Sequence, residues 1–260
     1  MPHELRLFLV ALQFLTRMPV PLGAAWQPEW VQQCARHFPG VGLLVGAFGA
    51  AVLWAASLLW PPPVAVLLSI AATVWVTGAF HEDGLADTCD GLGGAVGREH
   101  ALLIMKDSRL GSYGAVGLVL VLALKAAALV ALAQPALWPA LVALPLSHAL
   151  SRACAVALLR ALPYAGDAAH AKAKPLALGI DGTGLAVAGL WALAALAAAA
   201  AVLAPAAVAV AALAAALVTF AVARWLRRRL GGFTGDTLGA AQQFSEVAVY
   251  LALAAALPRV

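Results

Sequence analysis

The residues best suited to chemistry lie in one short acidic stretch, residues 78–94, with the sequence GAFHEDGLADTCDGLGG. This stretch holds Glu82, Asp83, Asp87 and Asp90, out of 12 acidic residues in the whole chain. In a helix the three aspartates share one face, because they stand at positions i, i+4 and i+7. Carboxylates this close raise each other's pKa values, and a hard cation such as Mg²⁺ or Mn²⁺ removes that penalty. The stretch therefore predicts a Mg²⁺ site, and a solvated acidic helix end is the simpler alternative.

A second stretch carries groups that suit phosphate. Residues 104–117, IMKDSRLGSYGAVG, bring Lys106, Asp107, Ser108 and Arg109 together just before an apolar segment. Lysine and arginine are natural phosphate partners, so Lys106 and Arg109 are candidates for catalysis. Ser108 is a candidate for substrate binding, and Asp107 is a candidate metal ligand. The alternative is that the basic residues only anchor the chain at a membrane surface.

A third stretch, residues 224–241, joins an arginine run to a glycine-rich loop, RWLRRRLGGFTGDTLGAA. Glycines near a helix start expose backbone N–H groups that can hold a phosphate. Asp236 is a candidate metal ligand or, alternatively, the N-terminal cap of that helix. The arginines either bind phosphate or enforce membrane topology. The candidates for substrate binding here are Arg228, Gly232, Thr234 and Gly235.

The composition is that of a membrane protein. Of the 260 residues, 64% are hydrophobic and only 11% are charged, whereas an ordinary soluble domain is about a quarter charged. A soluble chain of this length could not bury so much apolar surface. We therefore expect an all-α, polytopic bundle forming one membrane domain over residues 1–260. The three cysteines have neither CxxC nor CxxH spacing, so neither a disulfide framework nor a zinc site is expected.

The apolar segments predict about seven spanning helices, since a span needs about 20 apolar residues. They form three hairpins plus one helix, and within 1–40 an amphipathic helix over 5–20 is expected to be interfacial or re-entrant. The long polar connections all fall on one side, which carries most of the basic residues, Lys172 and Lys174 included. The positive-inside rule places that side in the cytoplasm. The spans are 41–60, 64–80, 113–133, 139–160, 183–203, 206–226 and 240–257, and the long connections are 81–112, 161–182 and 227–239.

A few ionisable residues fall inside the expected spans. By depth, Arg152 matches Glu246, and we expect the two to pair or to contact the substrate together, because buried charges in membranes are normally paired. Lys125 lies deeper and has no evident partner by depth. Gly42 and Gly46 are spaced for close packing of two helices.

The three polar stretches together supply what phosphoryl transfer needs, which is positioning and charge neutralisation. HEDGLADTCDGLGG, IMKDSRLGSYGAVGL and LGGFTGDTLGAA, with Glu246 following, resemble the cobalamin synthase family, the membrane enzymes also called adenosylcobinamide-GDP ribazoletransferases. LRLFLVALQFLTRMPVP and FPGVGLLVGA at 38–47 fit the same family. The match is weakest at 161–182, where family members tend to carry an arginine soon after Pro-Tyr-Ala.

The resemblance implies the final stage of vitamin B12 nucleotide-loop assembly in a bacterial cytoplasmic membrane. There α-ribazole, or its 5′-phosphate, displaces GMP from adenosylcobinamide-GDP with the help of Mg²⁺. The partners implied are these substrates and the lipid bilayer; a homo-oligomer is left open, and nothing points to nucleic acid. As a hypothesis, Asp83, Asp87 and Asp90, with Glu82 or Asp236, hold the metal, and His81 accepts the proton of the attacking hydroxyl.

Two rival functions are weighed against this. A transporter would place polar groups near the bilayer midplane on broken helices, but only Lys125 and His148 approach that depth. A phosphotransferase acting on CDP-activated alcohols would also use clustered aspartates. Its Asp-Gly-x-x-Ala-Arg pattern is not matched, because Asp87 stands where the arginine would. Release of GMP from adenosylcobinamide-GDP separates the synthase from both rivals.

Overall fold

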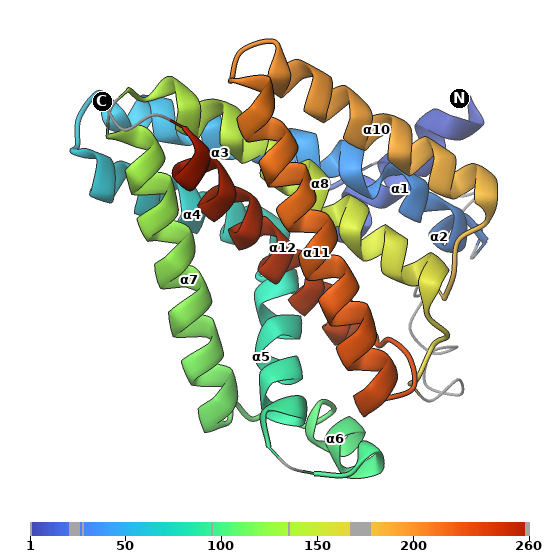
Figure 1. Cartoon of the computed structure of the whole chain (residues 1–260). Coiled ribbons are helices and arrows are strands. Elements are labelled where there is room, and N and C mark those ends of the chain that lie inside the picture. Colours follow the sequence, from blue (N-terminus) through green and yellow to red (C-terminus); the bar gives the residue numbers. More distant parts are fainter. Residues whose placement is uncertain are drawn as a thin grey trace.

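The computed structural model describes residues 2–20, 27, 29–94, 96–134, 136–166 and 178–257, and their regular elements are helices (Figure 1). Lys172 and Lys174 lie outside the described residues. The helices are α1 His3–Leu15, α2 Glu29–Cys34, the 3₁₀ helix η1 Ala35–His37, α3 Phe38–Ser57, α4 Pro62–Thr77, α5 Phe80–Gly93, α6 Arg98–Ile104, α7 Ser112–Ala133, α8 Trp138–Ala161, α10 Gly182–Ala200, α11 Pro205–Arg229 and α12 Gly235–Ala256.

The all-α membrane architecture is confirmed, but the number of spans differs from the prediction. Among the described residues, 5 helical segments are long and apolar enough to cross a membrane, or 6 if the bent pair α4–α5 is taken as one. The helix α12, expected as the seventh span, is not one of them. Its polar residues Gln242, Gln243 and Glu246 lower its hydropathy, and all three are buried against other helices. The protein is therefore a multi-pass membrane protein with a polar helix inside.

The chain bends sharply between α4 and α5. Gly78 and Ala79 both have left-handed backbones, with φ of 69° and 58°, and the two helices meet at 89°. The expected span 64–80 therefore ends at Thr77, and the acidic stretch forms a separate helix within the long connection 81–112. After the bend, α5 runs toward α6 and the long connections (Figure 1).

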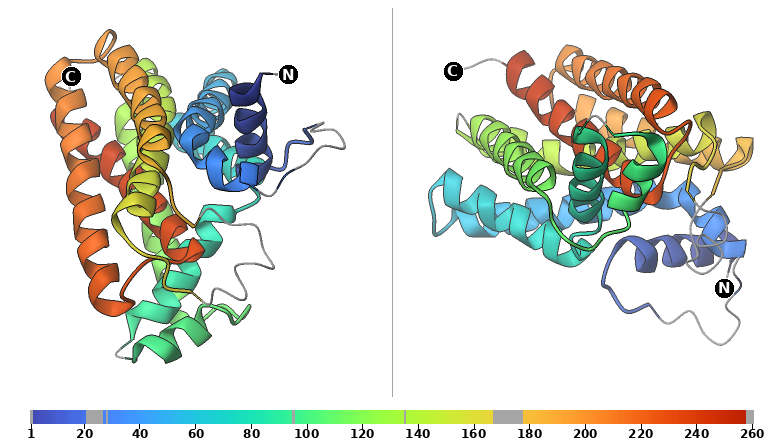
Figure 2. Two further views of the ribbon diagram at one scale, coloured as in Figure 1. Left: turned by 90° about the vertical axis from the view of Figure 1, so that its right-hand side faces the viewer. Right: turned by 90° about the horizontal axis from the view of Figure 1, so that it is seen from below.

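The helix α12 runs through the middle of the bundle, where it packs against α5, α7, α8 and α11 (Figures 1 and 2). Small residues let its first turns approach α5 closely. A Cβ added at Gly84 would lie 2.7 Å from the backbone oxygen of Asp236, and one added at Gly239 would lie 3.2 Å from that of His81. The contact brings the start of α12 against the acidic helix.

The helices α3 and α8 also approach closely, as predicted. A Cβ at Gly42 would meet the backbone of His148, and one at Gly46 would meet that of Pro145. This contact fixes α8, which carries the buried Arg152. Close packing at Gly42 and Gly46 is thus confirmed.

The N-terminal helix differs in detail from the prediction. It covers His3–Leu15 rather than 5–20, and it buries Leu7, Val10, Ala11 and Leu15. Phe8 and Leu12 of the same helix are only partly buried. The helix therefore packs its apolar side onto the bundle, beside α2 and α3.

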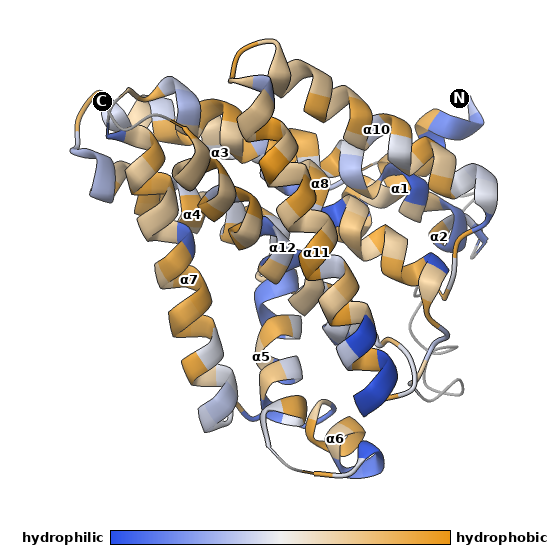
Figure 3. Ribbon diagram, in the orientation of Figure 1, coloured by the Kyte–Doolittle hydropathy of each residue, from blue (hydrophilic) through white to orange (hydrophobic). Residues whose placement is uncertain are grey.

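The two ends of the bundle differ in charge. The short turns after α3, α7 and α10 lie at one end, and the arginine-rich end of α11 lies beside α5 and α6 at the other (Figure 3). Arg229 links α11 to the end of α5, because its guanidinium donates to the carbonyls of Leu92 and Gly94. The three polar stretches of the sequence are therefore gathered on one side.

Candidate active site

The carboxylates of α5 face the start of α12. Asp83 is exposed, while Asp87 and Asp236 are half-buried. Neither Asp83 nor Asp87 makes a side-chain hydrogen bond or ion pair with another described residue. Partial burial, followed by the charges of Asp236, Asp83 and Asp90, raises the pKa of Asp87 to about 7. The local excess of negative charge that the sequence predicts is therefore present, and it spans two helices.

Two of the predicted metal ligands have other partners. Asp90 accepts hydrogen bonds of 2.8 Å from the backbone N–H groups of Gly111 and Gly114, at the start of α7. Glu82 points into the bundle, where its Oε1 accepts from Gln243 at 2.9 Å. Among the described residues, no three His, Cys, Asp or Glu side chains are arranged so that they could hold a metal ion.

Asp107 is the third predicted metal ligand that has another partner, because it is bound to Arg109. The Arg109 Nε lies 3.0 Å from each carboxylate oxygen, and these hydrogen bonds lower the pKa of Asp107 to about 2. Asp107 is not one of the charges that act on Asp87. Lys106 and Ser108 are exposed beside this pair. The second polar stretch is therefore a solvent-facing cationic loop rather than part of the carboxylate cluster.

The glycine-rich loop before α12 is shaped by packing. Thr234, not Asp236, caps α12, because its Oγ1 accepts from the backbone N–H of Thr237 and Thr237 returns the bond. A Cβ at Gly232 would lie 2.1 Å from the backbone oxygen of Pro163, since the segment hydrogen-bonds to the chain around Tyr164. Gly235 is the first residue of α12 and lies beside Asp236.

The arginine run divides into two kinds of residue. Arg229 and Arg227 donate to backbone carbonyls of neighbouring segments, including that of Ala161. Arg228 is exposed and makes no hydrogen bond with a described residue. Arg227 and Arg229 therefore hold connections together, and Arg228 is the member of the run that remains available to a ligand.

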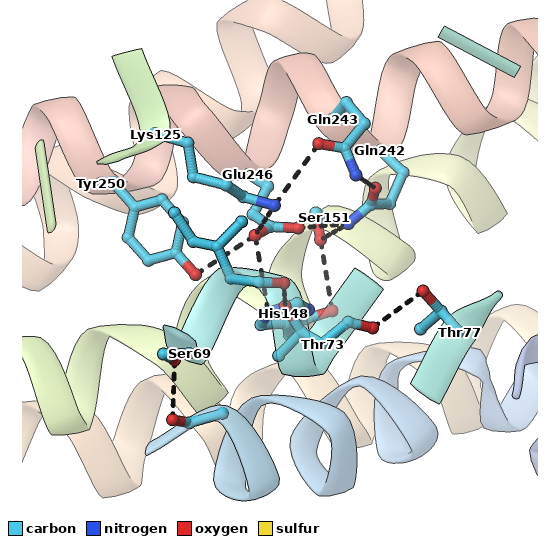
Figure 4. A network of polar contacts seen from close by, with 12 residues as sticks. Ser69, Thr73, Thr77, Lys125, His148, Ser151, Gln242, Gln243, Glu246 and Tyr250 are labelled. Carbon is cyan, nitrogen blue, oxygen red and sulfur yellow. Dashed lines mark hydrogen bonds and ion pairs between the residues drawn. The ribbon is translucent and has the colours of Figure 1, made fainter. Parts of the chain in front are cut away.

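A buried polar network lies deeper along α12 (Figure 4). Glu246 is 0% exposed, and it pairs with Lys125 Nζ at 2.7 Å and approaches His148 Nε2 at 3.5 Å. Tyr250 and Gln242 also donate to its carboxylate, at 3.2 and 2.6 Å. The charge of Glu246 is therefore compensated from several helices.

The network corrects two predictions. Arg152 does not hydrogen-bond to Glu246; its Nη1 lies 3.1 Å from Nδ1 of His148 and donates to the His148 backbone oxygen at 3.0 Å. Lys125, expected to lack a partner, is the cation that binds Glu246. Depth along a span does not specify where the end of a long lysine side chain lies. The sequence did carry a signal for this network, namely charged and amide residues within otherwise apolar segments.

His81 lies between the acidic cluster and the network. Together with Arg152 it borders two cavities, one polar and lined by residues such as Glu82 and Gln243, the other apolar. It makes no hydrogen bond with another described residue, and its ring meets that of Phe80 edge-on. His81 is therefore a buried imidazole on the helix that carries the carboxylates, and it borders both cavities.

The fold and this site define a polytopic, all-helical membrane enzyme that gathers acidic and cationic groups at one end of its bundle. The chain belongs to the cobalamin-5-phosphate synthase family, whose model matches residues 7–254.

Named relatives cover nearly the whole chain. An adenosylcobinamide-GDP ribazoletransferase of Leptothrix cholodnii is 60% identical over 251 residues, which are 96% of this chain and 95% of the relative. Proteins with the same name from Polaromonas naphthalenivorans and Vibrio cholerae are 44% and 43% identical, over 97% and 98% of this chain and 99% and 95% of their own lengths. No solved structure matches the chain. These relatives favour neither a transporter nor a CDP-alcohol phosphotransferase.

Proposed function

We propose that this protein completes the nucleotide loop of adenosylcobalamin by joining adenosylcobinamide-GDP with α-ribazole or its 5′-phosphate and releasing GMP. The observation that carries the proposal is the 60% identity to a named adenosylcobinamide-GDP ribazoletransferase over 96% of the chain. The carboxylates that α5 and α12 bring together supply the chemistry expected of a site that handles a diphosphate.

The transfer breaks a phosphoanhydride bond and forms a phosphoester bond. An acceptor hydroxyl forms a bond to the cobinamide-linked phosphorus, and the bond from that phosphorus to the oxygen of the GMP phosphate breaks. Because α-ribazole and its 5′-phosphate differ at the 5′ position, the attacking hydroxyl is one that both acceptors carry. His81 accepts its proton, because His81 is the imidazole that borders both cavities.

The carboxylate cluster suits Mg²⁺. Asp83, Asp87 and Asp236 would give carboxylate oxygens to the ion together with phosphate oxygens of the substrate, because no three acidic side chains of the described residues are arranged to hold it by themselves. When bound, Mg²⁺ supplies the positive charge that neutralises the diphosphate and the departing GMP phosphate. Asp90 and Glu82, bonded elsewhere, instead fix α7 and the buried network relative to α5.

The cationic side chains orient the phosphates. Lys106, Arg109 and Arg228 are exposed on the same side of the bundle as α5, and the charge of an arginine or lysine near a phosphate oxygen favours the bound diphosphate. The same basic side supports placing the site at the cytoplasmic face of a bacterial inner membrane.

The test uses the full chain in lipid nanodiscs with adenosylcobinamide-GDP, α-ribazole and Mg²⁺, and measures GMP by chromatography. We expect GMP release that requires both substrates and the cation, with an equal amount of the cobalamin product. The matched variants are Asp87→Asn and Glu99→Gln, the latter an exposed acidic residue on α6. Failure of the wild-type protein to release GMP, or full activity of Asp87→Asn, would overturn the proposal.

A further inference from the structure

An apolar cavity with aromatic walls adjoins the acidic site. Its empty space, counted together with the part that is open to solvent, is about 590 Å³. Five helices and two loops contribute to it: α1, α3, α5, α8 and α12, and the segments around Tyr164 and Phe233. Its lining residues are Phe14, Leu15, Phe38, Phe80, His81, Arg152, Ala155, Leu159, Tyr164, Phe233, Gly235, Leu238 and Gly239.

Contacts between aromatic rings hold the side chains that form the walls. Phe14 stacks on Phe38 with centroids 5.6 Å apart and meets Phe80 edge-on at 5.5 Å. Tyr164 and Phe233 form another edge contact at 5.6 Å. Such surfaces favour a flat aromatic ring, which gains stacking and edge contacts beyond its buried area.

The cavity also adjoins buried polar groups. Arg152 is 2% exposed and lines the cavity, and its Nε has no hydrogen-bond partner among the described residues. His81 contributes a second polar edge. A nitrogen-containing ring can satisfy such groups, whereas a lipid acyl chain leaves them without partners.

Some residues that line the cavity are close in sequence to residues of the acidic cluster. Gly235 and Gly239 flank Asp236 on α12, and His81 lies two residues before Asp83 on α5. A ligand whose flat ring occupies the cavity therefore lies against the two helices that carry these carboxylates. The site thus fits a compound with an apolar aromatic end and a polar hydroxylated end.

We propose that this cavity receives the planar aromatic base of the nucleoside acceptor, so that the ribose hydroxyl lies at the carboxylate cluster. This inference rests on the proposed function, and it assigns the acceptor's base to a cavity that α1, α3 and α8 complete together with residues of the first and third polar stretches. Phe38 and Ala155 then determine which acceptor bases are accepted.

The experiment fills the cavity. Ala155→Phe is compared with Ala153→Phe, a half-buried position on the same helix that does not line the cavity. We expect the first variant to raise KM for α-ribazole by about tenfold or more through steric exclusion, with KM for adenosylcobinamide-GDP unchanged. Equilibrium dialysis with α-ribazole is expected to show the same loss of binding.

The possible outcomes are distinguishable. If the wild-type protein releases no GMP, the proposed function fails and the inference falls with it. If the wild type is active but Ala155→Phe keeps its KM for α-ribazole, or raises that for adenosylcobinamide-GDP instead, only the inference is overturned. An equal effect of Ala153→Phe also overturns it, and so does loss of co-purified lipid from Ala155→Phe with unchanged α-ribazole binding.

A milder variant covers the case in which Ala155→Phe does not fold. Phe38→Leu removes one aromatic wall at similar bulk, and we expect KM for α-ribazole to rise about two- to tenfold. Free benzimidazole is expected to compete with α-ribazole in the wild type and to bind Phe38→Leu more weakly. Unchanged binding of both compounds in Phe38→Leu overturns the inference.

Discussion

The helix α12 carries two acidic regions whose electrostatic surroundings are opposite. At its start, Asp236 lies near Asp83 and Asp87, and partial burial together with these like charges raises the pKa of Asp87. Further along, Glu246 is buried against Lys125 and receives hydrogen bonds from its neighbours. Crowded like charge on the accessible side marks a place for a cationic ligand, whereas paired opposite charge in the interior marks structure.

The largest effect is expected in the interior. Glu246→Gln leaves Lys125 buried without its counter-charge, and the free energy of unfolding should fall by about 3–5 kcal/mol. The double variant with Lys125→Met should recover most of that loss, because no uncompensated charge remains. Reversible unfolding in mixed micelles measures both, and a double variant no more stable than the single one would contradict this account of the network.

At the acidic site the effect should appear in activity alone. Asp87→Asn is expected to lower kcat/KM for GMP release by about 10²–10³-fold, the usual loss for one electrostatic group at a reacting phosphate. The free energy of unfolding should stay the same or rise, because a repelling charge is removed. A fall in stability as large as that of Glu246→Gln would remove the contrast between the two regions.

The contact that joins α5 to α12 should show an intermediate effect. The added methyl group of Gly84→Ala meets the backbone of Asp236, so the helices separate at a cost of about 1–3 kcal/mol, with a parallel loss of activity. Gly97→Ala is the control, since a Cβ there meets nothing within 4 Å. Equal activity of the two variants would show that the spacing of α5 and α12 is unimportant.

The smallest effect distinguishes neighbouring arginines. Arg228→Ala is expected to raise KM for adenosylcobinamide-GDP by about tenfold with an unchanged melting temperature, because it removes one phosphate partner. Arg229→Ala loses its hydrogen bonds to Leu92 and Gly94, so its melting temperature should fall. Reversed behaviour of the two variants would contradict the division of the arginine run.

The sequence predicted the fold class, the helical acidic motif and the gathering of three polar stretches on one side. Helical spacing placed Asp83, Asp87 and Asp90 on one face. It could not predict that backbone N–H groups of Gly111 and Gly114, from a later segment, would bind Asp90. Side-chain partners from distant elements are not encoded in the period of one helix.

Similar reasoning explains the missed span and the missed ion pair. Apolar length alone made residues 240–257 a lipid-facing span, yet Gln242 and Gln243 on that helix serve a buried network. Depth along the spans matched Arg152 to Glu246, but the residue that forms the ion pair with Glu246 is Lys125, because helix rotation and side-chain length also decide which groups meet. Both errors come from treating spans as one-dimensional, because burial among helices depends on which face each residue occupies.

The most direct test of the central claim measures the cation itself. Electron paramagnetic resonance of Mn²⁺ titrated into the wild-type protein, Asp87→Asn and Glu99→Gln reports binding without reference to turnover. The account predicts a Mn²⁺ site that Mg²⁺ displaces and that Asp87→Asn weakens by about tenfold or more, with Glu99→Gln unchanged. Equal Mn²⁺ affinity in the wild type and Asp87→Asn would contradict a cation site between α5 and α12.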